Sequence, residues 1–135
     1  MSVFVKFDSF VEALAEKTHN LGSDALTIAL TDVAPSAANT VLANITEISY
    51  VYCSSRVVTV SASSQTDGTY KLVCTDLVLT ASGAVGPFRY VVLYNDTAIN
   101  DELIAYWDKG AEVTLASGET FTIDFDGTNG VLQIT

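Results

Sequence analysis

His19 is the only histidine of the chain and is therefore the first residue to consider for acid–base chemistry. A catalytic nucleophile needs a base within hydrogen-bonding reach, and imidazole most often fills that role near neutral pH. His19 stands beside Asn20 at the end of a predicted helix, without a partner motif around it. An imidazolium there is favoured by the negative end of the helix dipole. We interpret His19 as a helix-terminal residue and expect no catalytic residues.

Carboxylates and thiols are the next candidates for chemistry. The chain has 16 acidic residues, so pairs arise by chance and do not indicate a glycosidase. Asp124 and Asp126 share one face of a predicted strand before a Gly/Asn turn, but the full calcium-loop pattern with its distal glutamate is missing. Cys53 and Cys74 lack C-x-x-C spacing and are interpreted as small, partly buried, reduced residues. We predict no metal site and no cofactor.

Arg89 lies within the most apolar run of the chain, GPFRYVVLYND, over residues 86–96. Its planar guanidinium can pair with a carboxylate and stack on an aromatic ring in a subunit interface. Alternatively, its stem covers apolar surface while its head reaches water. Tyr106 and Trp107 are interpreted as core or interface anchors, with a sugar-binding face as the alternative. The residues predicted to contact another subunit or a lattice are Phe88, Arg89, Tyr90, Tyr94, Tyr106 and Trp107.

The composition limits the possible partners. The 135 residues fit one domain, 1–135, and 49% of them are hydrophobic. Only 16% are charged, below the usual ~25%, which fits a chain that hides surface against other chains, or a neutral monomer. The net charge is −10 and the cations are scattered singly, so we expect no direct nucleic-acid binding. No secretory signal or membrane-spanning run is visible, so we expect no membrane partner.

One amphipathic α-helix is predicted over about residues 8–21. The apolar residues that recur at helical spacing are Phe7, Phe10, Val11, Leu14 and Leu21. Ser9 with Glu12 forms a capping-box pattern at the start, and Gly22 is placed to close the end.

From about residue 25 to residue 134 the apolar spacing changes to two, which predicts short strands. The expected strands cover 26–31, 45–52, 58–62, 70–74, 77–79, 88–94, 103–107, 113–115 and 121–125. Asp67-Gly68 supplies the positive φ angles of a tight hairpin. The spacing is typical of a mainly β fold, an antiparallel β-sandwich or jelly-roll-like domain with one N-terminal helix.

Side-chain alternation predicts which residues share a face. The 26–31 strand is expected to be half-buried, with Leu26, Ile28 and Leu30 on its apolar face. In the 88–94 strand, one face is expected to hold Phe88, Tyr90, Val92 and Tyr94, and the other Arg89, Val91 and Leu93. A second sheet would cover one face of that strand, and the helix or a partner chain would cover the other.

Three long segments resemble a family of small virion structural proteins of tailed bacteriophages. They are FVEALAEKTHNLGSDALTIALTDVAPSAANTVLANITEI, GTYKLVCTDLVLTASGAVGPFRYVVLYND and GETFTIDFDGTNGVLQIT, and their most specific parts are HNLGSDALTIALT, GPFRYVVLYND and FDGTNGVL. These motifs are structural, so the resemblance implies no active-site residues. The stretch SYVYCSSRVVTVSAS departs from the glycine-rich version of that family.

The resemblance implies a non-enzymatic capsid decoration or cement protein. Such a protein is made in the bacterial cytoplasm and binds the outer head surface, with the major capsid protein and its own copies, as dimer or trimer, for partners. The helix or the SAANT loop would grip the lattice. The alternative is a tail, baseplate or fibre-associated protein, which can include glycan-receptor binding. A cell-wall hydrolase is a third class, and it would require an acid pair in an open cleft.

Overall fold

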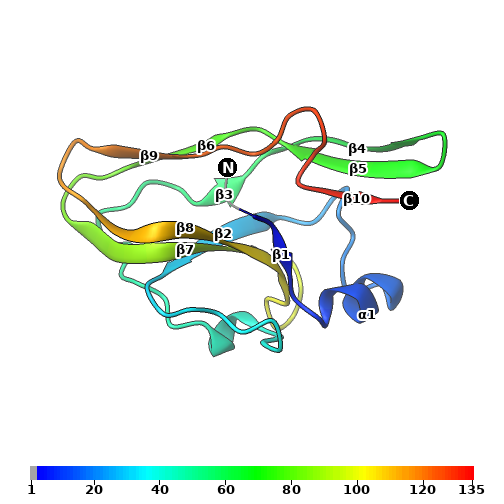
Figure 1. The fold of residues 1–135 in the computed structure, drawn as a ribbon, viewed down its shortest axis with the longest axis horizontal. Coiled ribbons are helices and arrows are strands. Elements are labelled where there is room, and N and C mark those ends of the chain that lie inside the picture. The colour runs from blue at the N-terminus through cyan, green and yellow to red at the C-terminus, as the bar shows by residue number, and fades with distance from the viewer. Residues whose placement is uncertain (1–2) are drawn as a thin grey trace.

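A computed structural model describes residues 3–135 and shows three antiparallel sheets with one short α-helix (Figure 1). The helices are α1 (Phe10–Ala15) and the 3₁₀ turn η1 (Leu42–Asn44). The strands are β1 (Val5–Lys6), β2 (Leu26–Thr31), β3 (Val57–Val58), β4 (Val60–Thr66), β5 (Thr69–Cys74), β6 (Leu77–Thr80), β7 (Val85–Asn95), β8 (Leu103–Leu115), β9 (Thr120–Ile123) and β10 (Leu132–Ile134). No helix in residues 3–135 has the length and apolar character needed to cross a bilayer.

The largest sheet has the order β1-β8-β7-β2-β3, and two small sheets, β10-β5-β4 and β6-β9, lie above it in Figure 1. The main core lies between them. Phe88 of β7 meets Phe121 of β9 edge-on at 5.2 Å between ring centroids, and Trp107 of β8 meets Phe125 at 6.1 Å. The predicted mainly β, antiparallel fold with one N-terminal helix is confirmed, and its sheets remain open.

A second, smaller core covers the opposite face of β7 and β2. It contains Phe7, Ala29, Ile45, Val92, Tyr94 and Leu103. Ile45 and the neighbouring Leu42 come from the long connection after β2, so this chain itself covers the face that was assigned to the helix or to a partner. All six residues of β2 are buried, and the half-buried prediction for this strand is therefore wrong.

The predicted alternation in β7 fails at one place. Pairing of β7 with β8 shifts register between Phe88 and Tyr90, and such a bulge resets which way side chains point. Phe88 therefore joins Val91 and Leu93 in the main core, whereas Val92 and Tyr94 lie in the smaller core. Sequence alternation had placed Phe88 on the same face as Tyr94.

The α-helix is shorter than the predicted span of 8–21, and it ends at Ala15. Lys17 adopts a positive φ of 71°, and the Lys17 and Thr18 amides donate to the carbonyls of Leu14 and Ala13. This pattern is a Schellman ending, which closes the helix well before Gly22. Ser9 makes no side-chain cap, so the predicted capping box is also absent.

The predicted strand at 45–52 is an irregular segment instead. It lies along the part of the β2 edge that β3 does not pair. The hydroxyl of Tyr50 accepts a hydrogen bond from the Leu30 amide at 2.9 Å. The Arg56 guanidinium donates to the Ile28 carbonyl at 2.7 Å and stacks on the Tyr50 ring at 3.6 Å. Side chains thus satisfy backbone groups that a neighbouring strand would otherwise pair.

The hairpin between β4 and β5 agrees with the prediction. Asp67 and Gly68 have φ values of 52° and 85°, as a two-residue turn of this type requires. Thr66 pairs with Thr69 across the turn.

Replacement of Phe88 by alanine tests the main core. Phe88 is fully buried, so the Phe88→Ala change should lower the free energy of unfolding by about 3–5 kcal/mol, through lost contacts and a cavity. Urea denaturation provides the measurement. The matched control is Val78→Ala on β6, where the side chain is 51% exposed and the change should stay within about 0.5 kcal/mol. Equal effects of the two substitutions would contradict this packing.

Candidate interaction surfaces

The six residues predicted to contact another subunit divide into a buried and a surface group. Phe88, Tyr94 and Trp107 are 0%, 5% and 7% exposed, so they belong to the cores of the chain itself. Trp107 is packed edge-on against Phe4 and Phe125. The surface group consists of Arg89, Tyr90 and Tyr106, which are partly exposed.

Arg89 forms its ion pair within the chain. Its Nε and Nη2 atoms donate to the two carboxylate oxygens of Asp108 on β8, at 2.8 and 3.0 Å. The guanidinium also lies 5.5 Å from the centroid of the Tyr90 ring. This contact lowers the pKa of Asp108 and holds β7 to β8 where their register shifts.

A pair of carboxylates stands near Arg89. Interaction with the neighbouring Asp32 carboxylate raises the pKa of Glu112, while the positive charge of Arg89 acts in the opposite direction. Both residues lie outside the apolar cleft between the two layers.

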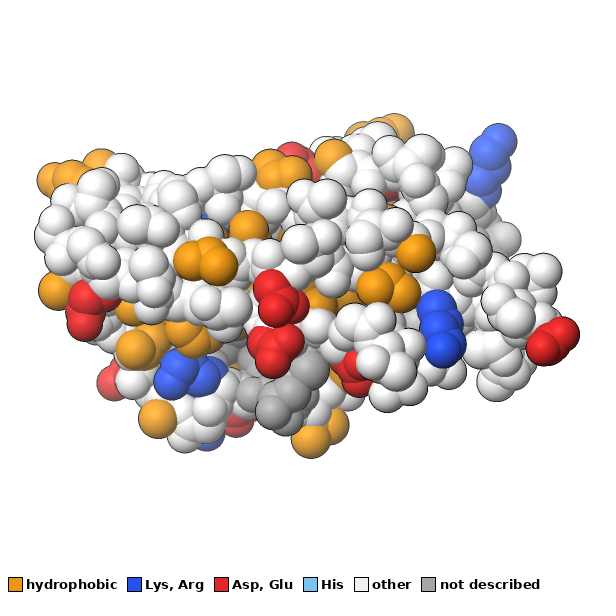
Figure 2. All heavy atoms as spheres, turned by 90° about the horizontal axis from the view of Figure 1, so that it is seen from above, with side chains coloured by type: hydrophobic (Ala, Val, Ile, Leu, Met, Phe, Trp, Pro, Cys, Tyr) orange, Lys and Arg blue, Asp and Glu red, His pale blue; other side chains and the backbone are white. Residues whose placement is uncertain are grey.

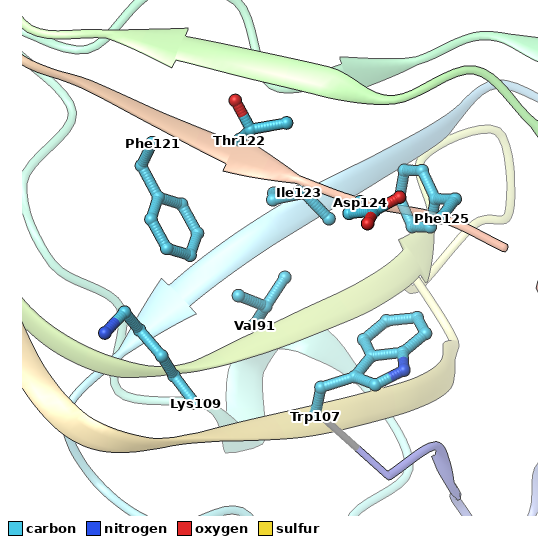
Figure 3. A pocket seen from close by; sticks show the side chains of 8 residues that line it. All are labelled: Val91, Trp107, Lys109, Phe121, Thr122, Ile123, Asp124 and Phe125. Carbon is cyan, nitrogen blue, oxygen red and sulfur yellow. The ribbon is translucent and has the colours of Figure 1, made fainter. Parts of the chain in front are cut away.

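An apolar cleft opens between the two layers at the edges of β8 and β9 (Figure 3). Its lining consists of Val91, Trp107, Lys109, Phe121, Thr122, Ile123, Asp124 and Phe125. The cleft has a volume of about 140 Å³, similar to the roughly 150 Å³ cavities that hold a benzene molecule. The lining has one carboxylate, Asp124, and one amine, Lys109, and is otherwise mainly apolar.

Asp126, the other acid of the calcium-like motif, is engaged in its own turn. Its Oδ1 accepts hydrogen bonds from the amides of Thr128 and Asn129, and its Oδ2 accepts one from the Asn129 side chain. These bonds lower the pKa of Asp126. Within residues 3–135, no group of three histidine, cysteine, aspartate or glutamate side chains is placed to hold a metal ion.

Both cysteines are free thiols held mainly in their protonated form. Cys74 is buried, and burial raises its pKa to about 11. Cys53 is partly buried, and its pKa is also raised by burial, against the opposing charge of Arg56. A raised thiol pKa reduces the thiolate available as a nucleophile at neutral pH.

His19 is buried and hydrogen-bonded to Asn95, and it does not lie at the end of the helix. This corrects the sequence interpretation. It is 4% exposed, and its Nδ1 lies 3.0 Å from the Asn95 side-chain nitrogen, which also donates to Asp24 at 2.7 Å. Because an amide nitrogen only donates, Nδ1 accepts and the neutral ring carries its proton on Nε2. Burial lowers the pKa of His19, while Glu102 and Asp24 oppose that shift.

Asn95 also fixes the loop between β7 and β8. Its Oδ1 accepts hydrogen bonds from the amides of Thr97 and Ala98, and the Thr97 hydroxyl accepts one from the Ala25 amide. The loop held in this way exposes 98% of the Ile99 side chain. Sequence analysis missed both Asn95 and Ile99. For Ile99 a signal existed, namely an isolated apolar residue among acids in NDTAINDE.

The two small sheets, β10-β5-β4 and β6-β9, form the upper layer in Figure 1 and present an outer face. Seen from above, uncharged polar side chains and backbone predominate, separate acidic and basic side chains lie among them, and the apolar groups are scattered rather than continuous (Figure 2). Exposed apolar residues include Val51, Tyr52 and Val78. Scattered apolar groups of this kind are normal on a protein surface and do not by themselves define an interface.

Comparison of the chain with protein-family models, with curated proteins and with solved structures gave no match.

Burial of His19 predicts that the free energy of unfolding decreases in mildly acidic solution. Because the folded chain disfavours protonation of His19, the unfolded chain binds more protons below pH 6.5, the ordinary value of the group. The contribution of His19 to the free energy of unfolding is complete above that pH and decreases as the pH falls below it. Urea denaturation between about pH 8 and pH 5.5 measures the effect. His19→Gln should show a shallower pH dependence, and an unchanged slope would contradict the assignment.

Proposed function

We propose that this chain is a non-enzymatic structural protein of a bacteriophage virion, a capsid decoration protein that binds and stabilises the head lattice as an oligomer. Its partners are the major capsid protein and further copies of the chain, as a dimer or trimer. It is made in the bacterial cytoplasm and acts on the outer surface of the head. The layers are proposed to form an antiparallel, jelly-roll-like β-sandwich within a single domain, 1–135.

The observation that carries this proposal is the structural use of groups that catalysis would require. The lone imidazole is bonded to Asn95 in the interior, and Asp126 caps its own turn. Cys74 is buried with its thiol protonated. Each of these groups stabilises the framework, as the structural motifs of the phage resemblance imply.

Each segment that carries the resemblance can be located in the fold. HNLGSDALTIALT contains His19, Asp24 and the buried strand β2. GPFRYVVLYND contains β7 up to Asn95, so the His19–Asn95–Asp24 hydrogen bonds join these two segments. FDGTNGVL contains the Asp126 turn and leads into β10. The resemblance thus rests on framework residues, which supports a role in assembly.

A decoration protein stabilises a shell by mass action, because it binds the assembled lattice and not the separate subunits. Heads that lack this chain should therefore gain density on their outer face when the purified chain is added, and they should rupture at a higher temperature. Electron microscopy and thermal rupture assays make these measurements. Density on the tail would favour the tail or fibre alternative, and absence of binding to any part of the particle would contradict the proposal.

A further inference from the structure

One end of the molecule combines two segments that are distant in the sequence. We call residues 41–47 together with residues 96–102 the acidic end. The Leu42 amide donates to the Asp101 carbonyl at 3.0 Å, and Val41 and Glu102 form a β-bridge. In Figure 1 these segments are η1 and the loop between β7 and β8, which lie together at the lower end of the molecule. Backbone hydrogen bonds therefore make this surface one unit.

The acidic end presents both an apolar projection and an apolar groove. Ile99 is 98% exposed at the tip of the β7–β8 loop. Beside it, a groove of about 510 Å³ is lined by Val41, Leu42, Ala43, Ile45, Glu47, Asn100 and Asp101. The buried Asn95 side chain holds the start of the loop through hydrogen bonds. The loop therefore loses little conformational entropy when it binds a partner.

The charges of the acidic end all have the same sign. It contains Glu47, Asp96, Asp101 and Glu102, and it has no lysine or arginine. Asp101 has a positive φ of 53°, and its pKa is raised by burial and by the charges of Asp96 and Glu102. Asp96 and Glu102 repel the Asp101 carboxylate in the free chain, and positive charges of a partner would relieve that repulsion.

We propose that the acidic end docks onto a cationic protein surface, with Ile99 entering an apolar hollow ringed by lysine or arginine side chains of the partner. Charge complementarity selects this occupant. A second copy of the chain does not fit, because its own acidic end would be repelled and its cations are scattered singly. The inference rests on the proposed function, since the partner surface is then the outer face of the phage head.

The test is the binding of purified variants to heads that lack this chain. Ile99→Ser removes the apolar projection, and the double variant Asp96→Asn with Asp101→Asn removes two charges while keeping side-chain shape. Each should weaken binding roughly tenfold or more, as loss of a buried anchor or of paired charges does. Raising NaCl from about 50 to about 500 mM should weaken the unmodified chain more than the double variant.

Two matched controls lie away from the acidic end. Asp67→Asn changes a hairpin aspartate with a φ of 52°, close to that of Asp101, and Val78→Ser changes an exposed apolar residue of β6. Both should bind like the unmodified chain, and thermal denaturation should show every variant folded. If the unmodified chain binds heads and the acidic-end variants bind equally well, the docking inference alone is overturned. If the unmodified chain does not bind, the proposed function fails and the inference fails with it.

Discussion

Burial of β2 and of residues 91–95 of β7 on both faces is the constraint on which the rest of the structure depends. The strands lie next to each other at the centre of the five-stranded sheet, so each apolar face must be covered by other parts of the chain. The two small sheets cover one face with Phe121 and Phe125, and the N-terminal segment and the long connection cover the other with Phe7 and Ile45. The long connection thus contributes Ile45 and the partly buried Leu42 to the smaller core, while most of its other residues remain at the surface. Its position also sets the shape of the acidic end.

The same constraint explains the polar interactions inside the molecule. A strand buried on both faces leaves backbone groups that water cannot reach, and these groups must be paired. Tyr50 and Arg56 supply hydrogen-bond partners along the part of the β2 edge that β3 does not pair. At the end of β7, the buried side chain of Asn95 connects His19, Asp24 and the following loop. These contacts determine which loops are held firmly, and hence which surfaces are ready to bind a partner.

Sequence periodicity predicted the elements that depend on local pattern. The Asp67-Gly68 hairpin follows from turn chemistry, and the strand at 70–74 lies where alternation predicted it. The predictions failed at positions where tertiary contacts determine the backbone conformation. The bulge after Phe88 reversed an expected face, and Lys17 ended the helix early in a conformation that its residue type rarely adopts. The hydrogen bonds of Asn95 could not be predicted, because its partners His19 and Asp24 lie more than 70 residues away in the chain.

The proposed function assigns this chain a β framework whose reactive side chains serve the fold and whose surfaces contact neighbouring subunits. Copy number per virion, measured by quantitative mass spectrometry against the major capsid protein, tests this claim most directly. A lattice-bound decoration protein should be present in hundreds of copies, because it repeats with the capsid lattice. A count of about a dozen or fewer, as expected for a tail component, or absence from the particle, would contradict it.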